Sequence, residues 1–323
     1  MNRSPIELAT SRSGSQLALW TLLVFFAAAN VLPVFPRAFP PVLYAAAQII
    51  PAMLFAFIHS ARVYGLRGSL SFAAISLAVG YVMEAIGVRN GFPFGHYYFT
   101  AGMGPKVFAV PILMGPAYLG MGYVAWARVI AASDDEAVWL AGPRVIGLPL
   151  AAGFAMVAWD LSFDPALSTF GRYWVWTRGG SYFGVPISNF LGWLLTNYLI
   201  CQLFALYLRR RSAPSRTGNL MAADARLAVF FYAVCAAGCA ARAASTPIPA
   251  TVTDATGTLW RVVDINNVCA LAAIFVMGPF VVLGATKLIG RPRAFRRAAD
   301  EPTVRHIPSP ESLPQPNELE QVP

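Results

Sequence analysis

The sequence predicts an all-α fold, a polytopic transmembrane helix bundle of about eight helices with both termini in the cytoplasm. Two observations lead to this prediction. Apolar residues make up 57% of the 323-residue chain and charged residues only 12%, a balance that soluble domains rarely show. The apolar residues also fall into long runs, and a helix needs about 20 of them to cross the hydrocarbon of a bilayer.

Eight segments are long enough, in the order 16–35, 41–60, 70–88, 107–131, 138–160, 186–208, 226–244 and 266–289. Arg3 and Arg12 precede the first segment as in a signal peptide, but the apolar run continues to Phe35, which favours an uncleaved helix. The seventh segment is the weakest because it is short and has Arg226 and Arg242 at its ends. Seven or eight helices are therefore expected.

The basic residues set the orientation. Lys and Arg number 24 against 15 Asp and Glu, for a net charge of +9. Most of them fall in the termini and in the loops that an even number of helices places on the same side as the termini, which is the cytoplasmic side by the positive-inside rule. Such loops meet anionic headgroups, so we expect a multi-pass protein of the cell's inner (cytoplasmic) membrane with membrane lipids as partners. No basic groove with interleaved aromatic residues is present, so nucleic acid is not an expected partner.

The chain divides into a transmembrane bundle over residues 1–290 and a tail over residues 291–323. The tail is rich in Pro and basic residues and is expected to be disordered and cytoplasmic. The four Cys residues all lie inside predicted helices, and no His or second Cys pair completes a metal site around them. We expect no metal and no cofactor.

Five acidic residues are set apart from the other ten. Glu84, Asp160, Asp164, Asp254 and Asp264 all lie at the outer ends of predicted helices or in outer loops. An ionisable residue inside a membrane segment is costly and is by default a functional candidate. Glu84 is the clearest case, because it lies about one turn inside the end of an apolar segment.

Two outer loops are rich in aromatic residues and Gly. Residues 91–100 read GFPFGHYYFT and residues 173–186 read YWVWTRGGSYFGVP. They are too apolar for free solvent and too rich in Gly and Pro for helix, so we expect them to fold over the mouth of the bundle. The alternative is an interfacial aromatic belt, but a belt should appear on both sides and these clusters occur on one.

A carboxyl group in apolar surroundings is stabilised in its neutral form and can then act as a proton donor. Asp160 and Asp164 are four positions apart and share a face if the helix continues to Asp164. Pro165 favours an extended Asp164, so the helix could instead end between them. The structural alternative is that Glu84 pairs with Arg89 or Lys106 and that the aspartates cap helix ends.

Other reaction classes have less support. No Gly-rich phosphate loop, H-E-x-x-H, G-x-S-x-G or Asp-rich diphosphate motif is present. Of the three His residues, His306 is in the tail and His59 is expected at the cytoplasmic interface. His96 lies in the aromatic loop near the acids and is kept as a site candidate.

Several short motifs follow one another along residues 84–193: Glu84-Ala85-Ile86-Gly87-Val88, residues 91–97, Val110-Pro111, Trp159-Asp160, Asp164-Pro165, Trp174-Val175-Trp176, residues 184–186 and Asn189-Phe190-Leu191-Gly192-Trp193. Taken together, these motifs resemble the integral-membrane carotenoid biosynthesis family. The resemblance covers residues 70–200 strongly and the other helices only by hydropathy. Known members hydrate the acyclic ends of carotenoids and are of the carotenoid 1′,2′-hydratase and bisanhydrobacterioruberin hydratase type.

The resemblance implies a hydratase that adds water to the terminal C=C of an acyclic carotenoid end and forms a tertiary alcohol. The polyene would enter from the bilayer, and other carotenoid pathway enzymes are implied as partners. Such a reaction needs a proton donor, stabilisation of a carbocation and a positioned water. The candidate catalytic residues are Glu84, Asp160 and Asp164. The candidate substrate-binding residues are His96, Tyr97, Trp174, Trp176, Tyr182, Asn189 and Trp193.

Two alternatives stay open. A proton-coupled transporter or lipid-binding membrane protein would also contain Pro-broken helices and intramembrane acids. Against it, no inverted repeat is visible and the acids cluster at one mouth. The other alternative is a different step of carotenoid biosynthesis.

Overall fold

A computed structural model describes residues 5–31, 39–131, 140, 142–211, 218–244 and 249–290. Most of these residues are helical, and six helices are long and apolar enough to cross a membrane. The spans are Gly14–Val31, Pro41–Asn90, Arg144–Phe170, Ile187–Arg210, Ala225–Ala243 and Val262–Lys287. The tail expected over residues 291–323 lies outside the described residues.

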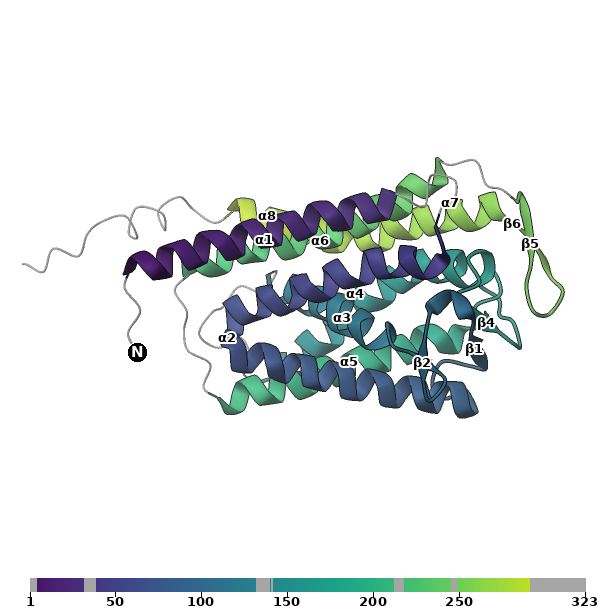
Figure 1. Ribbon diagram of the computed structural model, residues 1–323, viewed down its shortest axis with the longest axis horizontal. Coiled ribbons are helices and arrows are strands. Elements are labelled where there is room, and N and C mark those ends of the chain that lie inside the picture. The colour runs from purple at the N-terminus through teal and green to yellow at the C-terminus, as the bar shows by residue number, and fades with distance from the viewer. Residues whose placement is uncertain are drawn as a thin grey trace, which may run out of the picture. The chain divides into compact units, whose positions relative to one another are not determined.

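The count differs from the expected eight partly because two expected segments, 41–60 and 70–88, form one element, α2 (Pro41–Asn90). This element is broken at Gly65, which has φ 76° and ψ 166°. Glycine adopts a positive φ at little cost because it has no Cβ. The two legs of α2 therefore lie side by side (Figure 1).

Serine side chains hold the two legs together near the turn. Ser60 donates a hydrogen bond of 2.8 Å to the hydroxyl of Ser69. Ser69 in turn donates one of 2.9 Å to the carbonyl of Phe57. Both serines are buried, so these bonds satisfy hydroxyl groups that hydrocarbon would leave unpaired.

The helix expected over 107–131 begins later than predicted. The structure starts α3 at Met114 (Met114–Ala131), and its 18 residues are not among the six candidate spans. The preceding residues form two short strands, β2 (Lys106–Val107) and β3 (Val110–Pro111), which pair with each other. The turn between the two strands contains two residues at positive φ. Hydropathy alone does not report this change of backbone conformation.

The aspartate helix extends further than Pro165 suggested. Helix α4 (Arg144–Pro165) runs on as a π-helical turn, η3 (Ala166–Phe170). Asp160 and Asp164 both belong to α4, so they lie on one face of the same helix. The possibility that the helix ends between them is thus not realised.

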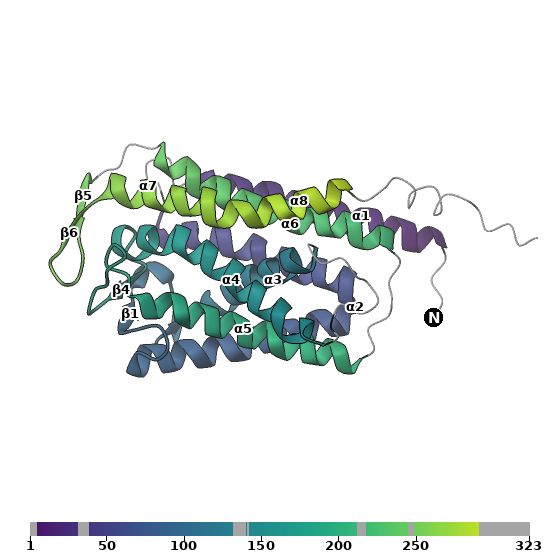
Figure 2. The same cartoon turned by 180° about the vertical axis from the view of Figure 1, so that it is seen from behind.

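The remaining helices complete two layers. They are α1 (Pro5–Val31), α5 (Ile187–Arg210), α6 (Gly218–Ala243), α7 (Val262–Ala272), η4 (Ala273–Met277) and α8 (Gly278–Gly290). The last three form one continuous helical run. Figures 1 and 2 show α1, α6, α7 and α8 in one layer, and α2, α3, α4 and α5 in the other.

The aromatic loops meet at one end of the bundle. Strand β1 (Tyr97–Phe99) pairs antiparallel with β4 (Trp174–Trp176), although the two are far apart in the sequence. A short 3-10 helix, η2 (Ala101–Met103), follows β1. Tyr97, Phe99 and Trp176 are buried, which agrees with loops that fold over the helices. At the same end, β5 (Thr251–Thr253) and β6 (Leu259–Arg261) form a hairpin.

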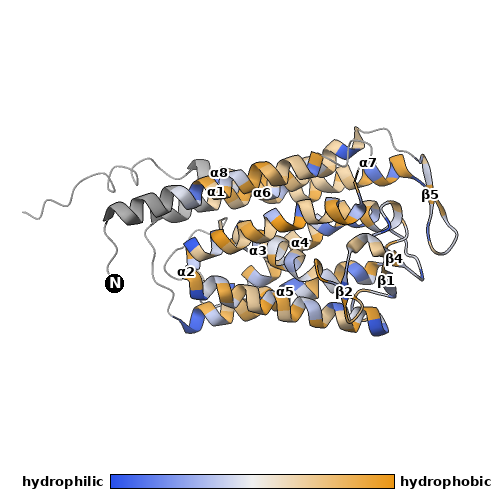
Figure 3. Cartoon of the chain, viewed as in Figure 1, coloured by the Kyte–Doolittle hydropathy of each residue, from blue (hydrophilic) through white to orange (hydrophobic). Residues whose placement is uncertain are grey.

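The outer surface of the helices is apolar. Large side chains such as Phe25 and Phe275 are 63% and 70% exposed. In Figure 3 apolar residues dominate the helices and hydrophilic residues gather at several of their ends. A helix that is apolar on its exposed face is suited to lipid.

Candidate active site

Glu84 lies on the second leg of α2 and is only 3% exposed. Tyr118 of α3 donates a hydrogen bond of 2.8 Å to its Oε1. Tyr97 of β1 donates another to its Oε2. Each carboxyl oxygen therefore has a hydroxyl donor, one from helix α3 and one from strand β1.

Two glycines on the same face of α2 allow the tyrosines to approach. A Cβ at Gly80 would lie 2.7 Å from the ring of Tyr118, and a Cβ at Gly87 would lie 2.9 Å from the hydroxyl of Tyr97. These positions are one turn to either side of Glu84. The spacing Gly80, Glu84, Gly87 therefore creates room for both donors.

No cation neutralises Glu84 among the described residues. Lys106, one of the two expected partners, instead donates its ammonium hydrogen bond to the carbonyl of Phe99. Arg89, the other, makes no ion pair with Glu84 within the described part of the chain. The ion-pair alternative for Glu84 is thus not observed.

The two aspartates share one amide. Asn189 on α5 donates from Nδ2 to Asp160 Oδ2 at 2.8 Å and to Asp164 Oδ2 at 2.5 Å. Trp174 of β4 donates from its indole nitrogen to Asp164 Oδ1 at 3.0 Å. Asp160, Asp164 and Asn189 are all buried. The amide and the indole therefore satisfy carboxyl groups that have no cationic partner in the described residues.

A small cavity joins the two polar groups. Glu84 and Asn189 both line it, and the other lining residues are Phe94, Tyr97, Phe99, Met114, Trp174, Trp176 and Trp193. Its volume is about 20 Å³. About 10 to 15 Å³ is enough for a single water molecule. The cavity can thus hold one water between a carboxyl, an amide and aromatic rings.

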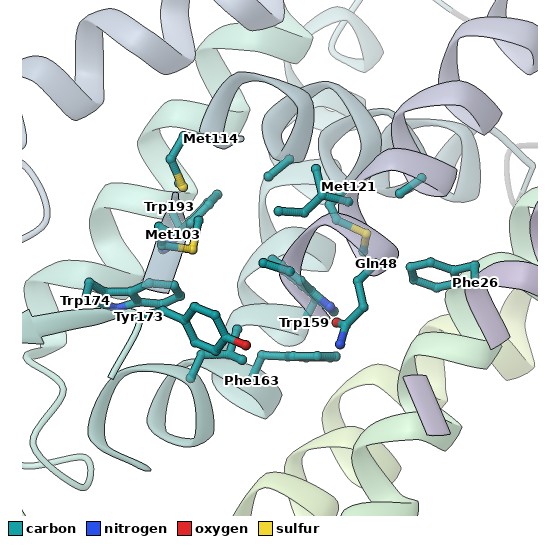
Figure 4. A pocket seen from close by; sticks show the side chains of 15 residues that line it. Phe26, Gln48, Met103, Met114, Met121, Trp159, Phe163, Tyr173, Trp174 and Trp193 are labelled. Carbon is teal, nitrogen blue, oxygen red and sulfur yellow. The ribbon is translucent and has the colours of Figure 1, made fainter. Parts of the chain in front are cut away.

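A larger apolar cavity of about 90 Å³ adjoins it. Met114, Trp174 and Trp193 line both cavities. Figure 4 shows these three side chains toward one end of the larger cavity, with Gln48 and Phe26 toward the other. The wall is formed mostly by aromatic, Met and Ala side chains, which suits a hydrocarbon ligand.

The structure brings together most of the residues predicted for the site. Glu84, Tyr97, Trp174, Trp176, Asn189 and Trp193 line the small cavity, and Asp160 and Asp164 bind Asn189. Two others lie elsewhere. The ring of His96 packs against Gly91, and Tyr182 donates its hydroxyl to the carbonyl of Leu161. Neither His96 nor Tyr182 lines the cavities described above.

Asp254 and Asp264 have local structural roles. Asp254 accepts hydrogen bonds inside its own hairpin, including one of 2.9 Å from Trp260. Burial acts to raise the pKa of Asp254, but hydrogen bonds from Thr256, Trp260 and Thr258 outweigh it, so the pKa lies below its ordinary value. Asp264 forms an exposed ion pair of 2.7 Å with Arg261.

Sequence reasoning missed several contributors. Tyr118 binds Glu84, and Phe94, Phe99 and Met114 line the small cavity. A hydroxyl in the middle of the apolar segment that became α3 was an available signal for Tyr118. Within the described residues, no cluster of three His, Cys, Asp or Glu side chains could hold a metal ion.

Comparisons with known proteins identify the family of the chain. Residues 44–259 match the family described as carotenoid biosynthesis protein. Bisanhydrobacterioruberin hydratase from Haloarcula japonica is 29% identical over 143 residues, which are 43% of this chain and 45% of that protein. The match thus spans less than half the length of that curated relative. No solved structure gives a significant match. The family match covers more than half of the chain and includes every residue that lines the small cavity, so the chain belongs to the carotenoid biosynthesis protein family.

Proposed function

We propose that the protein hydrates the terminal C=C of an acyclic carotenoid end group and forms a tertiary alcohol. The observation that carries this proposal is the pair of adjoining cavities. One has room for a water molecule beside Glu84 and Asn189, and the other has an apolar wall. The hydratase name of the H. japonica relative supports the same reaction class.

Glu84 is the proton donor in this proposal because it is the acid that lines the small cavity. Its carboxylic acid transfers a proton to the less substituted alkene carbon, and the π electrons form the new C–H bond. The positive charge then rests on the tertiary carbon. The oxygen of water bonds to that carbon, and the Glu84 carboxylate takes back a proton from the resulting oxonium. Alkene and water thus give the alcohol with no net redox change.

The carbocation needs neighbouring groups that stabilise its positive charge without forming a bond to the cation. Trp174 and Trp193 line both cavities, and Trp176 lines the smaller one. A cation over an indole face gains about 2 kcal/mol or more when both are shielded from water. These indoles are the groups proposed to stabilise the tertiary cation.

Asn189 is proposed to hold the water. Its Nδ2 is directed toward two carboxyl groups, so its Oδ1 is the atom that remains to accept a hydrogen bond. Asp160 and Asp164 then act through Asn189 and are positioning residues. Direct proton donation by either aspartate is the competing assignment.

The membrane arrangement is proposed from the sequence and the folded helices together. Counting the two legs of α2 and the shorter α3 separately supports eight passes. An even number places both termini on one side, and the positive-inside rule makes that side cytoplasmic. The cavities lie at the end of the bundle that β1 and β4 cover. This end would then face the outer side of the cytoplasmic membrane, where a polyene can enter from the bilayer.

The test is expression in cells that make lycopene or γ-carotene, with mass spectrometry for the gain of one water. Glu84→Gln should reduce the hydrated product by about a hundredfold or more, the usual range for a general acid. Asp160→Asn and Asp164→Asn should reduce it less, with the protein still inserted. Asp264→Asn is the matched control, because that carboxyl lies in an exposed ion pair.

Two results would contradict the proposal in different ways. Full activity in Glu84→Gln combined with loss in Asp160→Asn would move the proton donor to the aspartates. No hydrated product from the wild type with any acyclic-ended carotenoid would exclude the hydratase function.

A further inference from the structure

A half-buried amide lines the larger cavity. Gln48, on the first leg of α2, is the one side-chain amide among the 15 residues that line this cavity. It makes no hydrogen bond with any described residue. An amide in apolar surroundings loses its hydrogen bonds to water and is costly unless a partner replaces them.

A second unpaired group faces the same cavity. The indole nitrogen of Trp159, on α4, is buried and has no hydrogen-bond partner in the part of the chain that the structure describes. Figure 4 shows the Gln48 amide and the Trp159 ring directed toward one another. By contrast, two other polar groups of the wall are occupied. Tyr173 donates to the carbonyl of Pro41, and Trp174 donates to Asp164.

We propose that Gln48 and Trp159 form a subsite for a hydroxyl group carried by the substrate. The chemistry of the two side chains favours a hydroxyl. The indole N–H can only donate, whereas the amide can both donate and accept. A hydroxyl oxygen accepts from Trp159 and its hydrogen is donated to Gln48 Oε1, so one alcohol satisfies both side chains.

The place of this subsite limits where the hydroxyl lies on the substrate. Gln48 lies at the opposite end of the cavity from Trp174 and Met114, which adjoin the small cavity. The hydroxyl is thus carried on the same end group as the reacting C=C but separated from it along the chain. The protein would then act after a reaction that introduces an alcohol. This inference rests on the proposed function for the location of the C=C.

The test uses the purified full chain in detergent micelles and two acyclic carotenoids of equal length. Both carry a terminal C=C, and one also has a hydroxyl within that end group. Quenching of tryptophan fluorescence gives the affinity, and product analysis gives the hydration rate. The wild type should bind the hydroxylated polyene about tenfold more tightly, as one to two additional hydrogen bonds allow.

Variants separate recognition from packing. Gln48→Leu should remove the preference for the hydroxylated polyene, while the polyene without a hydroxyl binds equally well or better. Trp159→Phe should reduce the same preference. Gln202→Leu is the matched control, since Gln202 is another helical glutamine with an unpaired carbonyl oxygen but does not line this cavity. It should retain the preference.

Equal wild-type affinity for the two polyenes would overturn the subsite, as would equal weakening of both by Gln48→Leu. Hydration without preference would leave the proposed function standing and remove the subsite. Preferential binding of the hydroxylated polyene without any hydration would support the subsite and contradict the proposed function.

Discussion

The hydroxyl of Tyr118 donates a hydrogen bond of 2.8 Å to Oε1 of Glu84, and this bond links α3 to α2 inside the bundle. The ring of Tyr118 also stacks on Trp193, with ring centroids 4.7 Å apart. One residue of α3 therefore contacts both the candidate acid and an indole of the cavity wall.

Tyr118→Phe should lower hydration about tenfold, because the ring packing remains and one hydrogen bond to the carboxyl is lost, worth roughly 1 to 2 kcal/mol. The measurement is the yield of hydrated carotenoid per inserted protein. Tyr123→Phe is the control, since the Tyr123 hydroxyl is hydrogen-bonded to His59 and does not line the cavities described above. Equal loss in both variants would indicate a general effect on packing.

Asn189 and Asp160 should be energetically coupled. Asn189→Leu removes the amide donor from both carboxyl groups, but Asp164 keeps the indole of Trp174. The loss should therefore cost about 1 to 3 kcal/mol, mostly at Asp160. Asp160→Leu removes one of those groups, so the double variant should be less destabilised than the sum of the singles. A coupling of about 0.5 to 3 kcal/mol is expected from thermal unfolding in detergent. Additive effects would show that the two side chains do not interact.

Gly80→Ala should impair both folding yield and hydration. The new methyl group would lie 2.7 Å from the Tyr118 ring, so the ring and its hydrogen bond to Glu84 must shift. Overpacking of this kind costs about 1 to 3 kcal/mol. Gly147→Ala in α4 is the control, because nothing lies within 4 Å of its added Cβ. Normal activity in Gly80→Ala would contradict the proposed role of this glycine.

Gly65→Ala tests the turn inside α2. No atom lies within 4 Å of the added Cβ, so the effect should come from the backbone alone. With φ 76° and ψ 166°, Gly65 lies in a region that essentially only glycine adopts, and holding another residue there costs on the order of 1 to 3 kcal/mol. We expect a lower unfolding temperature with the activity per folded molecule retained. Gly14→Ala in α1 has the same open space without a positive φ, and its unfolding temperature should not fall.

The hairpin β5–β6 should loosen in acid. The pKa of Asp254 is lower in the folded protein than its ordinary value, so its contribution to stability is present above about pH 4 and is lost as the pH falls through the folded-state pKa. Hydrogen exchange over residues 251–261, corrected for the intrinsic rate, should be flat from neutral pH to about 5 and then rise. Asp254→Ala should show the raised exchange at every pH. An unchanged exchange rate in that variant would exclude Asp254 as the residue that holds the hairpin.

Much of the site was predictable because charge is rare inside apolar segments. Glu84, Asp160 and Asp164 stand out for that reason, and the motif around Asn189 and Trp193 supported them. Tyr118 did not stand out, since a tyrosine in an apolar helix is equally compatible with ordinary packing. Gln48 is similar, because its importance depends on a cavity formed by residues from separate helices.

The fold was predictable in its class and less so in its details. Hydropathy located both legs of α2, but it could not show that Gly65 alone joins them. It also placed the start of α3 too early, since residues 107–113 are apolar yet not helical. Three-residue strands such as β1 and β4 have too few positions to show a pattern, and their pairing depends on the folded helices between them.

That pairing of β1 with β4 has a consequence for biosynthesis. Residues 97–99 leave the ribosome long before residues 174–176, and Asn189 is made later still. Glu84, Tyr97 and Tyr118 can therefore meet in the nascent chain before their indole and amide neighbours exist. Strand β1 cannot pair until α3, α4 and β4 have been made, and Asn189 joins the site only with α5. Shortened chains that end before α5 should therefore insert in the membrane without assembling a complete site.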